Sequence, residues 1–251
     1  QKIGSRENAA GRIHLNPQTW AVIADVADAD RARAVMDRVV DMLEFKAGPV
    51  LLYPAYSVPD EGIGYLTRYA PGTRENGAVY THAATWAVIA SAKLGRSEDA
   101  FRLFRKVNPI ERGKNLREYC AEPYVTAGNI DGPESPFYGR GGWTWYSGSA
   151  AWLWKAGFEW ILGVRASRTG LLVEPCIPRR WKGYTVTRTF RGATYHIAVK
   201  NPEGKGRGIR SVMIDGRPME QFTAGSSVIL PEFPKGTAHT ITIFMGGQSD
   251  V

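Results

Sequence analysis

Four polar side chains that could form a binding site lie close together in the sequence: Tyr69, Arg74, Glu75 and His82. A guanidinium and an imidazole can both donate hydrogen bonds to an anion. The same residue types also have ordinary structural uses. A single histidine beside apolar residues is often part of a core, and adjacent Arg and Glu often form a solvated surface pair. Spacing alone therefore leaves both a functional and a structural role open.

The local pattern predicts that these residues surround the junction of a loop and a helix. Two turn-forming pairs, Pro71-Gly72 and Asn76-Gly77, predict an ordered loop over residues 68–77. After this loop, apolar residues recur at three- and four-residue steps, which predicts a helix over 78–94. Free backbone N–H groups and the helix dipole make such a helix start suitable for an anion.

Longer sequence blocks around these residues resemble a known family. Arg68-Tyr-Ala-Pro-Gly72, Arg74-Glu-Asn-Gly77 and Tyr80-Thr-His82 resemble the glycoside phosphorylases of glycoside hydrolase family 94. That family includes cellobiose, chitobiose, laminaribiose and cellodextrin phosphorylases and a domain of the cyclic β-1,2-glucan synthases. Four further blocks continue the resemblance in the family's order: Leu15-Asn-Pro-Gln-Thr-Trp20, Glu122-Pro-Tyr124, the stretch 141–150, and Glu174-Pro-Cys-Ile-Pro178.

The periodicity of the first two thirds of the chain is helical. Helices are expected over 17–27, 29–45, 78–94, 97–107 and 145–162, with Asp28 and Ser97 as starting residues. Two long loops, 48–77 and 108–142, separate them, and loops of that length are commonly functional. Paired helices with such loops suggest the C-terminal part of an (α/α)6 toroid over residues 1–170.

After about residue 170 the pattern changes to short alternating strands. They are expected over 171–173, 184–190, 193–199, 209–214, 227–230 and 239–244. This pattern predicts a small antiparallel β-sandwich over residues 171–251, as family relatives also have. The fold class is therefore predicted as α+β and multidomain.

The resemblance implies an inverting phosphorolysis of a β-glycoside. One carboxylic acid would protonate the leaving oxygen, and phosphate would attack the opposite face in place of an activated water. By resemblance, His82, Ser147 and Gly148 match phosphate-binding positions, where relatives usually have Thr at the position of Ser147. The product would be α-glucose 1-phosphate. A stretch of small residues at 147–151 could instead allow close helix packing.

Sugar-binding positions are matched less closely. Tyr69 and Arg74 match acceptor-sugar positions, but Lys is usual where this chain has Arg74, and Arg is not equivalent to Lys at such a site. Glu75, Glu122 and Tyr146 are further candidates for substrate binding, and Trp143 and Trp145 could stack on sugar faces. Relatives often have a Gln shortly after the Glu-Pro-Tyr block, and residues 126–129 contain none. The linkage and the acceptor sugar are therefore left open.

The family's general acid is an Asp in an Asp-Trp-Asn segment, and residues 1–251 contain no such segment. No catalytic residue is therefore expected in this chain, and the acid is expected upstream. The chain starts at Gln1 without Met and reads as part of a longer protein. The missing N-terminal part is an expected partner, a homodimer is possible, and residues 1–251 alone are expected to turn nothing over.

The composition argues against several other classes of protein, including nucleic-acid-binding, membrane and metal-binding proteins. The formal charge is +8, but Lys and Arg are dispersed, so we expect no nucleic-acid partner. The sequence contains no apolar run long enough to span a membrane, so we expect no membrane partner. Two distant cysteines read as free thiols in a reducing cytoplasm, and four histidines without a ligand pattern make a metal site unexpected. Inorganic phosphate is expected as co-substrate, with no cofactor.

Three alternatives to a phosphorylase remain. An inverting hydrolase on the same toroid would use Glu75 or Glu122 as its base. The chain could also belong to the phosphorylase-like domain of a cyclic β-1,2-glucan synthase, to which the block at 141–150 is closest. A third alternative, which involves no catalysis, is that the chain is a carbohydrate-binding or structural module in which the β-sandwich of residues 171–251 is the functional part.

Overall fold

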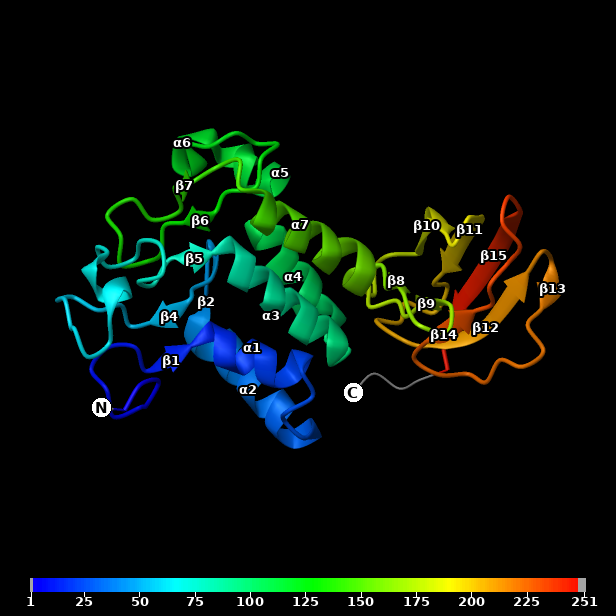
Figure 1. Ribbon diagram of the computed structural model, residues 1–251, viewed down its shortest axis with the longest axis horizontal. Coiled ribbons are helices and arrows are strands. Elements are labelled where there is room, and N and C mark those ends of the chain that lie inside the picture. The colour runs from blue at the N-terminus through cyan, green and yellow to red at the C-terminus, as the bar shows by residue number, and fades with distance from the viewer. Residues whose placement is uncertain (1, 248–251) are drawn as a thin grey trace. The chain divides into compact units, whose positions relative to one another are not determined.

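The computed structural model describes residues 2–247, which fold into two compact units. The first unit comprises Gln1–Leu94 and Arg102–Ala156, and the second comprises Gly95–Phe101 and Gly157–Val251. The predicted domain limits, 1–170 and 171–251, stay predictions. Both helix and sheet are present, as the α+β class requires (Figure 1).

The first unit is built around a buried central helix. Helix α3 (Thr81–Lys93) packs against α1 (Leu15–Ile23), α2 (Ala29–Leu43) and α7 (Ser147–Lys155), as Figure 1 shows. Its residues from Ala83 to Ala92 are buried with one exception, Trp86. Because alanines dominate this helix, its neighbours can approach its backbone closely from several sides.

The predicted helices are present with shifted ends. Helix α2 begins after Asp28, whose side chain accepts a hydrogen bond from the backbone N–H of Arg31 at 2.8 Å, as expected of an N-cap. Helix α4 spans Ser97–Val107 as predicted, with acidic residues in its first turn and basic residues in its last. The helix expected over 145–162 is divided into α7 and a π-helical segment, Ala156–Ile161.

The two long loops contain short ordered elements. The first carries β3 (Gly48–Pro49), β4 (Leu52–Tyr53) and a 3₁₀ turn, Tyr65–Arg68; the second carries α5 (Pro109–Arg112), a 3₁₀ turn, Gly113–Asn115, and α6 (Leu116–Tyr119). Strand β4 pairs with β1 (Ile13–His14), and β3 pairs with β2 (Glu44–Phe45).

Asn76 fixes the loop that holds the polar cluster. Its fully buried amide donates to the carbonyls of Tyr56 and Tyr69 at 2.9 and 2.8 Å, and its Oδ1 accepts from the N–H of Tyr56 at 2.8 Å. The amide therefore forms hydrogen bonds with backbone N–H and C=O groups that would otherwise be unpaired inside the loop. The expectation of an ordered loop over 68–77 is confirmed.

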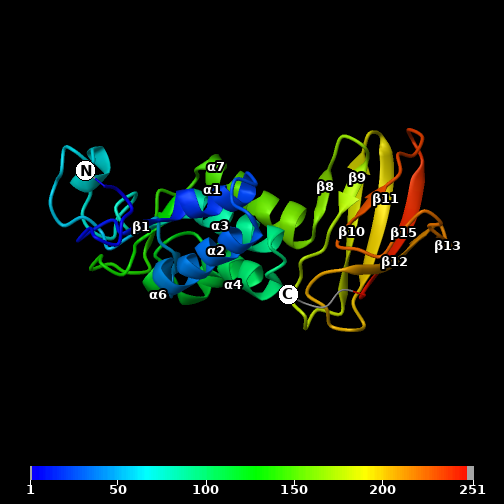
Figure 2. The ribbon, with the colours of Figure 1, turned by 90° about the horizontal axis from the view of Figure 1, so that it is seen from below.

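Two sheets form most of the second unit, and Figure 2 shows their strands. The larger has the order β10 (Gly183–Phe190), β11 (Ala193–Lys200), β15 (Ala238–Met245), β12 (Ile209–Ile214) and β13 (Arg217–Pro218). The smaller has the order β14 (Val228–Leu230), β9 (Leu171–Val173) and β8 (Val164–Ala166). All six predicted strands are present.

One part of the sandwich prediction is wrong, because the larger sheet is not purely antiparallel. Strands β11 and β15 pair in parallel, with Ile197 opposite Ile241, while the other neighbours in the sheet pair antiparallel. Alternating residues reveal a strand but carry no information on the direction of its partner. The helices described here do not amount to a closed toroid, so the (α/α)6 architecture stays a prediction. Within residues 2–247, no helix has the length and apolar character needed to span a bilayer.

Candidate active site

A small sheet brings separate chain segments to one end of the helical unit. Strands β5 (Val79–Tyr80), β6 (Asn129–Ile130) and β7 (Gly141–Gly142) pair antiparallel, with Asn129 opposite both Tyr80 and Gly142. Strand β5 runs directly into α3, and β7 precedes the turn that enters α7. The sheet therefore places the first turns of the two packed helices beside the same strands.

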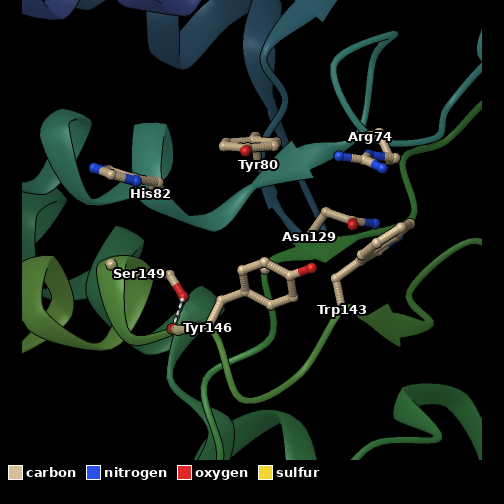
Figure 3. Close-up of a pocket in the computed structure, with 9 residues that line it drawn as sticks. Arg74, Tyr80, His82, Asn129, Trp143, Tyr146 and Ser149 are labelled. Atoms are coloured by element: carbon tan, nitrogen blue, oxygen red, sulfur yellow. Dashed lines mark hydrogen bonds between the residues drawn. The ribbon is translucent and has the colours of Figure 1, made fainter.

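A cavity of about 100 Å³ lies at this point. Four of the predicted residues line it: Arg74, His82, Tyr146 and Gly148. Figure 3 shows the labelled side chains around this space.

His82 reaches the cavity from the first turn of α3. Its ring lies against Trp86 and Trp152, with ring centroids 5.1 and 5.9 Å away. Burial lowers the pKa of His82 below its ordinary value, so the imidazole is neutral near pH 7. Within residues 2–247 its ring nitrogens have no hydrogen-bond partner, which leaves them available to a ligand.

Gly148 faces His82 from the first turn of α7. A Cβ added at Gly148 would lie 3.6 Å from both Cε1 and Nδ1 of the His82 ring. The absence of a side chain therefore keeps the space beside the imidazole open. Ser147, the first residue of α7, is exposed and does not line the cavity, although it adjoins Tyr146 and Gly148, which do.

Arg74 supplies a positive charge, and aromatic rings hold it. Its guanidinium carbon lies 4.1 Å from the ring centroid of Trp143 and 4.9 Å from that of Tyr69. Cation–π contacts of this kind fix a guanidinium while leaving its N–H groups free to donate. Tyr69 therefore contacts Arg74, which lines the cavity, but the Tyr69 side chain does not line the cavity itself.

Glu75 points to a different cavity, of about 410 Å³, which Gln18 and His14 also line. Its Oε2 lies 3.5 Å from Nε of Arg74 but is buried without a hydrogen-bond partner in the described structure. Nε2 of His14 is also buried without a hydrogen-bond partner in the described structure, and burial lowers the pKa of His14. The predicted cluster is therefore divided, because neighbouring Arg74 and Glu75 serve two cavities.

Glu122 is partly exposed and forms a hydrogen bond with an aromatic residue. Its Oε1 accepts a hydrogen bond from Nε1 of Trp145 at 3.0 Å. A bond from its own backbone N–H, followed by the one from Trp145, lowers the pKa of the carboxyl. Glu122 does not line the cavity at His82.

Four lining residues were missed as candidates: Tyr80, Gly128, Asn129 and Ser149. Trp143, considered only for stacking on sugars, also lines the cavity. Asn129 lies in the stretch where a Gln was sought, so an amide was present there but was overlooked. Ser149 lies two residues into α7, and its Oγ donates to the carbonyl of Tyr146 at 3.1 Å. No group of three or more His, Cys, Asp or Glu in the described part of the chain could hold a metal ion.

The family model "Glycosyl hydrolase 94 superfamily, catalytic domain" matches residues 1–163, more than half of the chain. The chain belongs to this family. The resemblance inferred from the sequence blocks is thus confirmed. These blocks supply Arg74, His82, Tyr146 and Gly148 to the cavity.

Three known proteins are similar to this chain over most of its length. An N,N'-diacetylchitobiose phosphorylase of Vibrio furnissii is 36% identical over 98% of this chain and 30% of its own length. A solabiose phosphorylase of Paenibacillus borealis is 32% identical over 98% of this chain and 31% of its own. The cyclic beta-(1,2)-glucan synthase NdvB of Rhizobium meliloti (strain 1021) is 40% identical over 84% of this chain and 8% of its own. The chain thus spans less than a third of these relatives.

Proposed function

We propose that this chain is the C-terminal part of an inverting glycoside phosphorylase. The whole enzyme would cleave β-linked gluco-disaccharides or oligosaccharides with inorganic phosphate and release α-glucose 1-phosphate. One observation carries this proposal: none of the residues lining the small cavity is a carboxylate, while Arg74 and His82 both are lining residues. A cavity with one cation and several neutral donors fits an anionic nucleophile, whereas an inverting hydrolase needs a carboxylate base beside its water.

Each residue has a role in the proposed phosphate site. The neutral His82 imidazole donates one N–H to a phosphate oxygen, and the Arg74 guanidinium contributes charge and further donors. The backbone N–H of Gly148 and the hydroxyl of Ser147 belong to the first turn of α7, where unpaired N–H groups favour an anion. Phosphate held in this way would attack the anomeric carbon without a protein base.

The sugar and the proton donor come from other groups. Tyr69, Arg74, Glu75, Glu122 and Tyr146 are proposed to contact the substrate, with Glu75 acting from the larger cavity beside Arg74. The general acid is proposed to be an upstream Asp of the whole protein, protonating the leaving oxygen. No cofactor is required, because phosphate and one acid complete the exchange of one glycosidic bond for a glycosyl phosphate.

A second candidate function rests on a specific similarity. The 40% identity to the glucan synthase NdvB is higher than the identity to either phosphorylase described above, although it covers a shorter part of the chain. In that case the phosphorylase-like domain would belong to a larger protein that acts on β-1,2-glucan. The sequence of the whole parent protein separates the two, since a synthase would also contain a glycosyltransferase domain.

The deciding experiment uses the full-length parent protein with a panel of β-linked glucobioses and oligoglucans, with and without phosphate. The readout is α-glucose 1-phosphate. Its formation only in the presence of phosphate is expected, and the best substrate would identify the linkage. Release of free glucose at the same rate without phosphate would overturn the proposal and return the assignment to a hydrolase.

A further inference from the structure

Two large aromatic side chains lie exposed outside the small cavity. Tyr124 and Trp145 have 73% and 71% of their surfaces exposed. They come from different segments, yet their ring centroids are only 6.4 Å apart at an interplanar angle of 70°. Two exposed aromatic rings in contact form an apolar surface that a flat ligand can cover. We call these two residues the aromatic pair.

The aromatic pair is held in place. The indole N–H of Trp145 donates to Oε1 of Glu122 at 3.0 Å, so the ring is anchored at its polar edge. The backbone of Trp145 has φ of 69°, and that of Trp143 has φ of 55°. For bulky residues this left-handed conformation is unfavourable and persists only where the surroundings hold it, which is common at ligand-binding sites.

In the sequence, one member of the aromatic pair is adjacent to residues that line the cavity. Trp145 lies between Trp143 and Tyr146 in sequence order, and both of these flanking aromatics line the cavity at His82. The rings of Trp143 and Tyr146 are 6.1 Å apart, and Figure 3 shows both beside the cavity. A sugar chain that is bound next to the phosphate cavity and extends along this segment would therefore meet the aromatic pair.

We propose that Tyr124 and Trp145 bind an additional sugar unit of a β-linked glucan longer than a disaccharide, with Glu122 positioning the Trp145 ring. This inference rests on the proposed phosphorolysis and extends it to the substrate's length. Aromatic rings with one polar edge satisfied suit a ligand that has both apolar C–H faces and hydroxyl groups. The Glu122 carboxylate, which is partly exposed, keeps acceptor capacity on its second oxygen for the hydroxyl groups of a sugar.

The test uses the full-length parent protein and the linkage found to support phosphorolysis, in chains of increasing length. Three variants remove or conserve the surface: Trp145→Ala, Tyr124→Ala and Trp145→Phe. Trp154→Ala is the matched control, because Trp154 is another exposed tryptophan, 54% accessible, on α7. The quantities measured are kcat/KM for each chain length and KM for phosphate.

Both alanine variants are expected to lose about three- to tenfold in kcat/KM on the longer chains. On the disaccharide they should stay within about twofold, as should KM for phosphate in every variant. Trp145→Phe should retain most of the activity on longer chains, and Trp154→Ala should behave as the wild type. Because disaccharide activity serves as an internal standard, a folding defect cannot imitate this pattern.

Two outcomes would overturn the inference while leaving the proposed function intact. One is a loss that is equal for the disaccharide and the longer chains. The other is an unchanged chain-length profile in both alanine variants; an altered oligomeric state of the same variants would then show that another protein surface covers the aromatic pair. A wild-type enzyme that forms no α-glucose 1-phosphate from any chain would instead overturn the proposed function, and this inference with it.

Discussion

At the scale of single residues, Gly148 is the position where fold and ligand binding can best be separated. A Cβ there would make ordinary van der Waals contact with His82, at 3.6 Å, and would occupy space in the cavity where the anion is proposed to bind. Gly148→Ala in the full-length protein is expected to raise KM for phosphate about tenfold, because it displaces a bound oxygen. The melting temperature should be unchanged or higher, since Ala is about 1 kcal/mol more favourable than Gly within a helix.

Steady-state kinetics at varied phosphate and a thermal melt would check both parts. Gly225→Ala is a suitable control, because the nearest atom to its added Cβ is a carbonyl oxygen 3.7 Å away in the second unit. An unaltered KM for phosphate in Gly148→Ala would place the anion elsewhere. A lowered melting temperature would show that the first turn of α7 is packed more tightly than the geometry indicates.

His82 links the site to the pH dependence of stability. Burial lowers its pKa below the ordinary 6.5, so the unfolded chain binds a proton more readily than the folded chain. Stability from this group is therefore fully present above about pH 6.5 and is lost as the pH falls below that value. His14, whose pKa burial also lowers, acts in the same direction.

Replacing His82 should reduce this dependence. His82→Gln is expected to show a shallower fall in melting temperature than the wild type between about pH 7 and pH 5, because one proton-uptake site is removed. Differential scanning calorimetry of both proteins at matched ionic strength would measure the two slopes. Identical slopes would mean that His82 titrates alike in the folded and unfolded chains.

At the scale of elements, helices and strands with repeating patterns could be predicted from the sequence. The amphipathic α2 and the capped α4 carry periodic and terminal signals, and alternating β11 buries every second residue. The π-helical segment Ala156–Ile161 could not be predicted, because its side chains continue the pattern of α7. Parallel pairing of β11 with β15 was equally hidden, since the β-strand period is the same in either direction.

The candidate site was predictable only in part for a related reason. Arg74 and His82 were found because they lie in recognisable blocks beside a helix start. Tyr80 and Asn129 meet through paired strands of only two residues each, and such short strands have no periodicity to detect. The division of Arg74 and Glu75 between two cavities depends on the left-handed backbone of Arg74, φ 48°, which the sequence does not specify.

Ion pairs of Glu174 connect separate segments of the second unit. The carboxylate of Glu174, just after β9, pairs with Arg165 of β8 and with Arg207, 2.6 Å from its Nη2. All three side chains are largely shielded from solvent, at 18–29% exposure. Glu174→Gln keeps the shape but leaves both guanidinium groups short of an ionic partner, and should lower the free energy of unfolding by about 1–3 kcal/mol.

Glu232→Gln is the matched control for this prediction. Glu232 pairs with Arg191 in the same unit, but both side chains are nearly half exposed, so its loss should cost under about 1 kcal/mol. Urea denaturation of the two variants and the wild type would measure the difference. If Glu174→Gln were no more destabilised than Glu232→Gln, the shielded pairs would contribute no more than an ordinary surface pair.

At the scale of the whole molecule, the proposed chemistry is distributed over more protein than these residues contain. The chain spans 30% of the chitobiose phosphorylase to which it is similar, and the small cavity has no carboxylate among its lining residues. Phosphate recognition and proton donation would then lie on separate parts of one polypeptide. A stable fold in both units described here is a precondition for bringing those parts together.

The two cysteines, one in each unit, provide a test of that stability. Cys120 is exposed, whereas Cys176 is 2% exposed and burial raises the pKa of its thiol to about 12. Since the thiolate is the reactive form, iodoacetamide near pH 8 should modify Cys120 in the native full-length protein and leave Cys176 intact until the second unit unfolds. Peptide mass spectrometry across a urea series would measure both sites, and Glu174→Gln should bring the labelling of Cys176 to a lower urea concentration. Modification of Cys176 at a rate comparable to Cys120 without denaturant would show that the second unit opens readily, and would contradict the expectation drawn from the burial of Cys176.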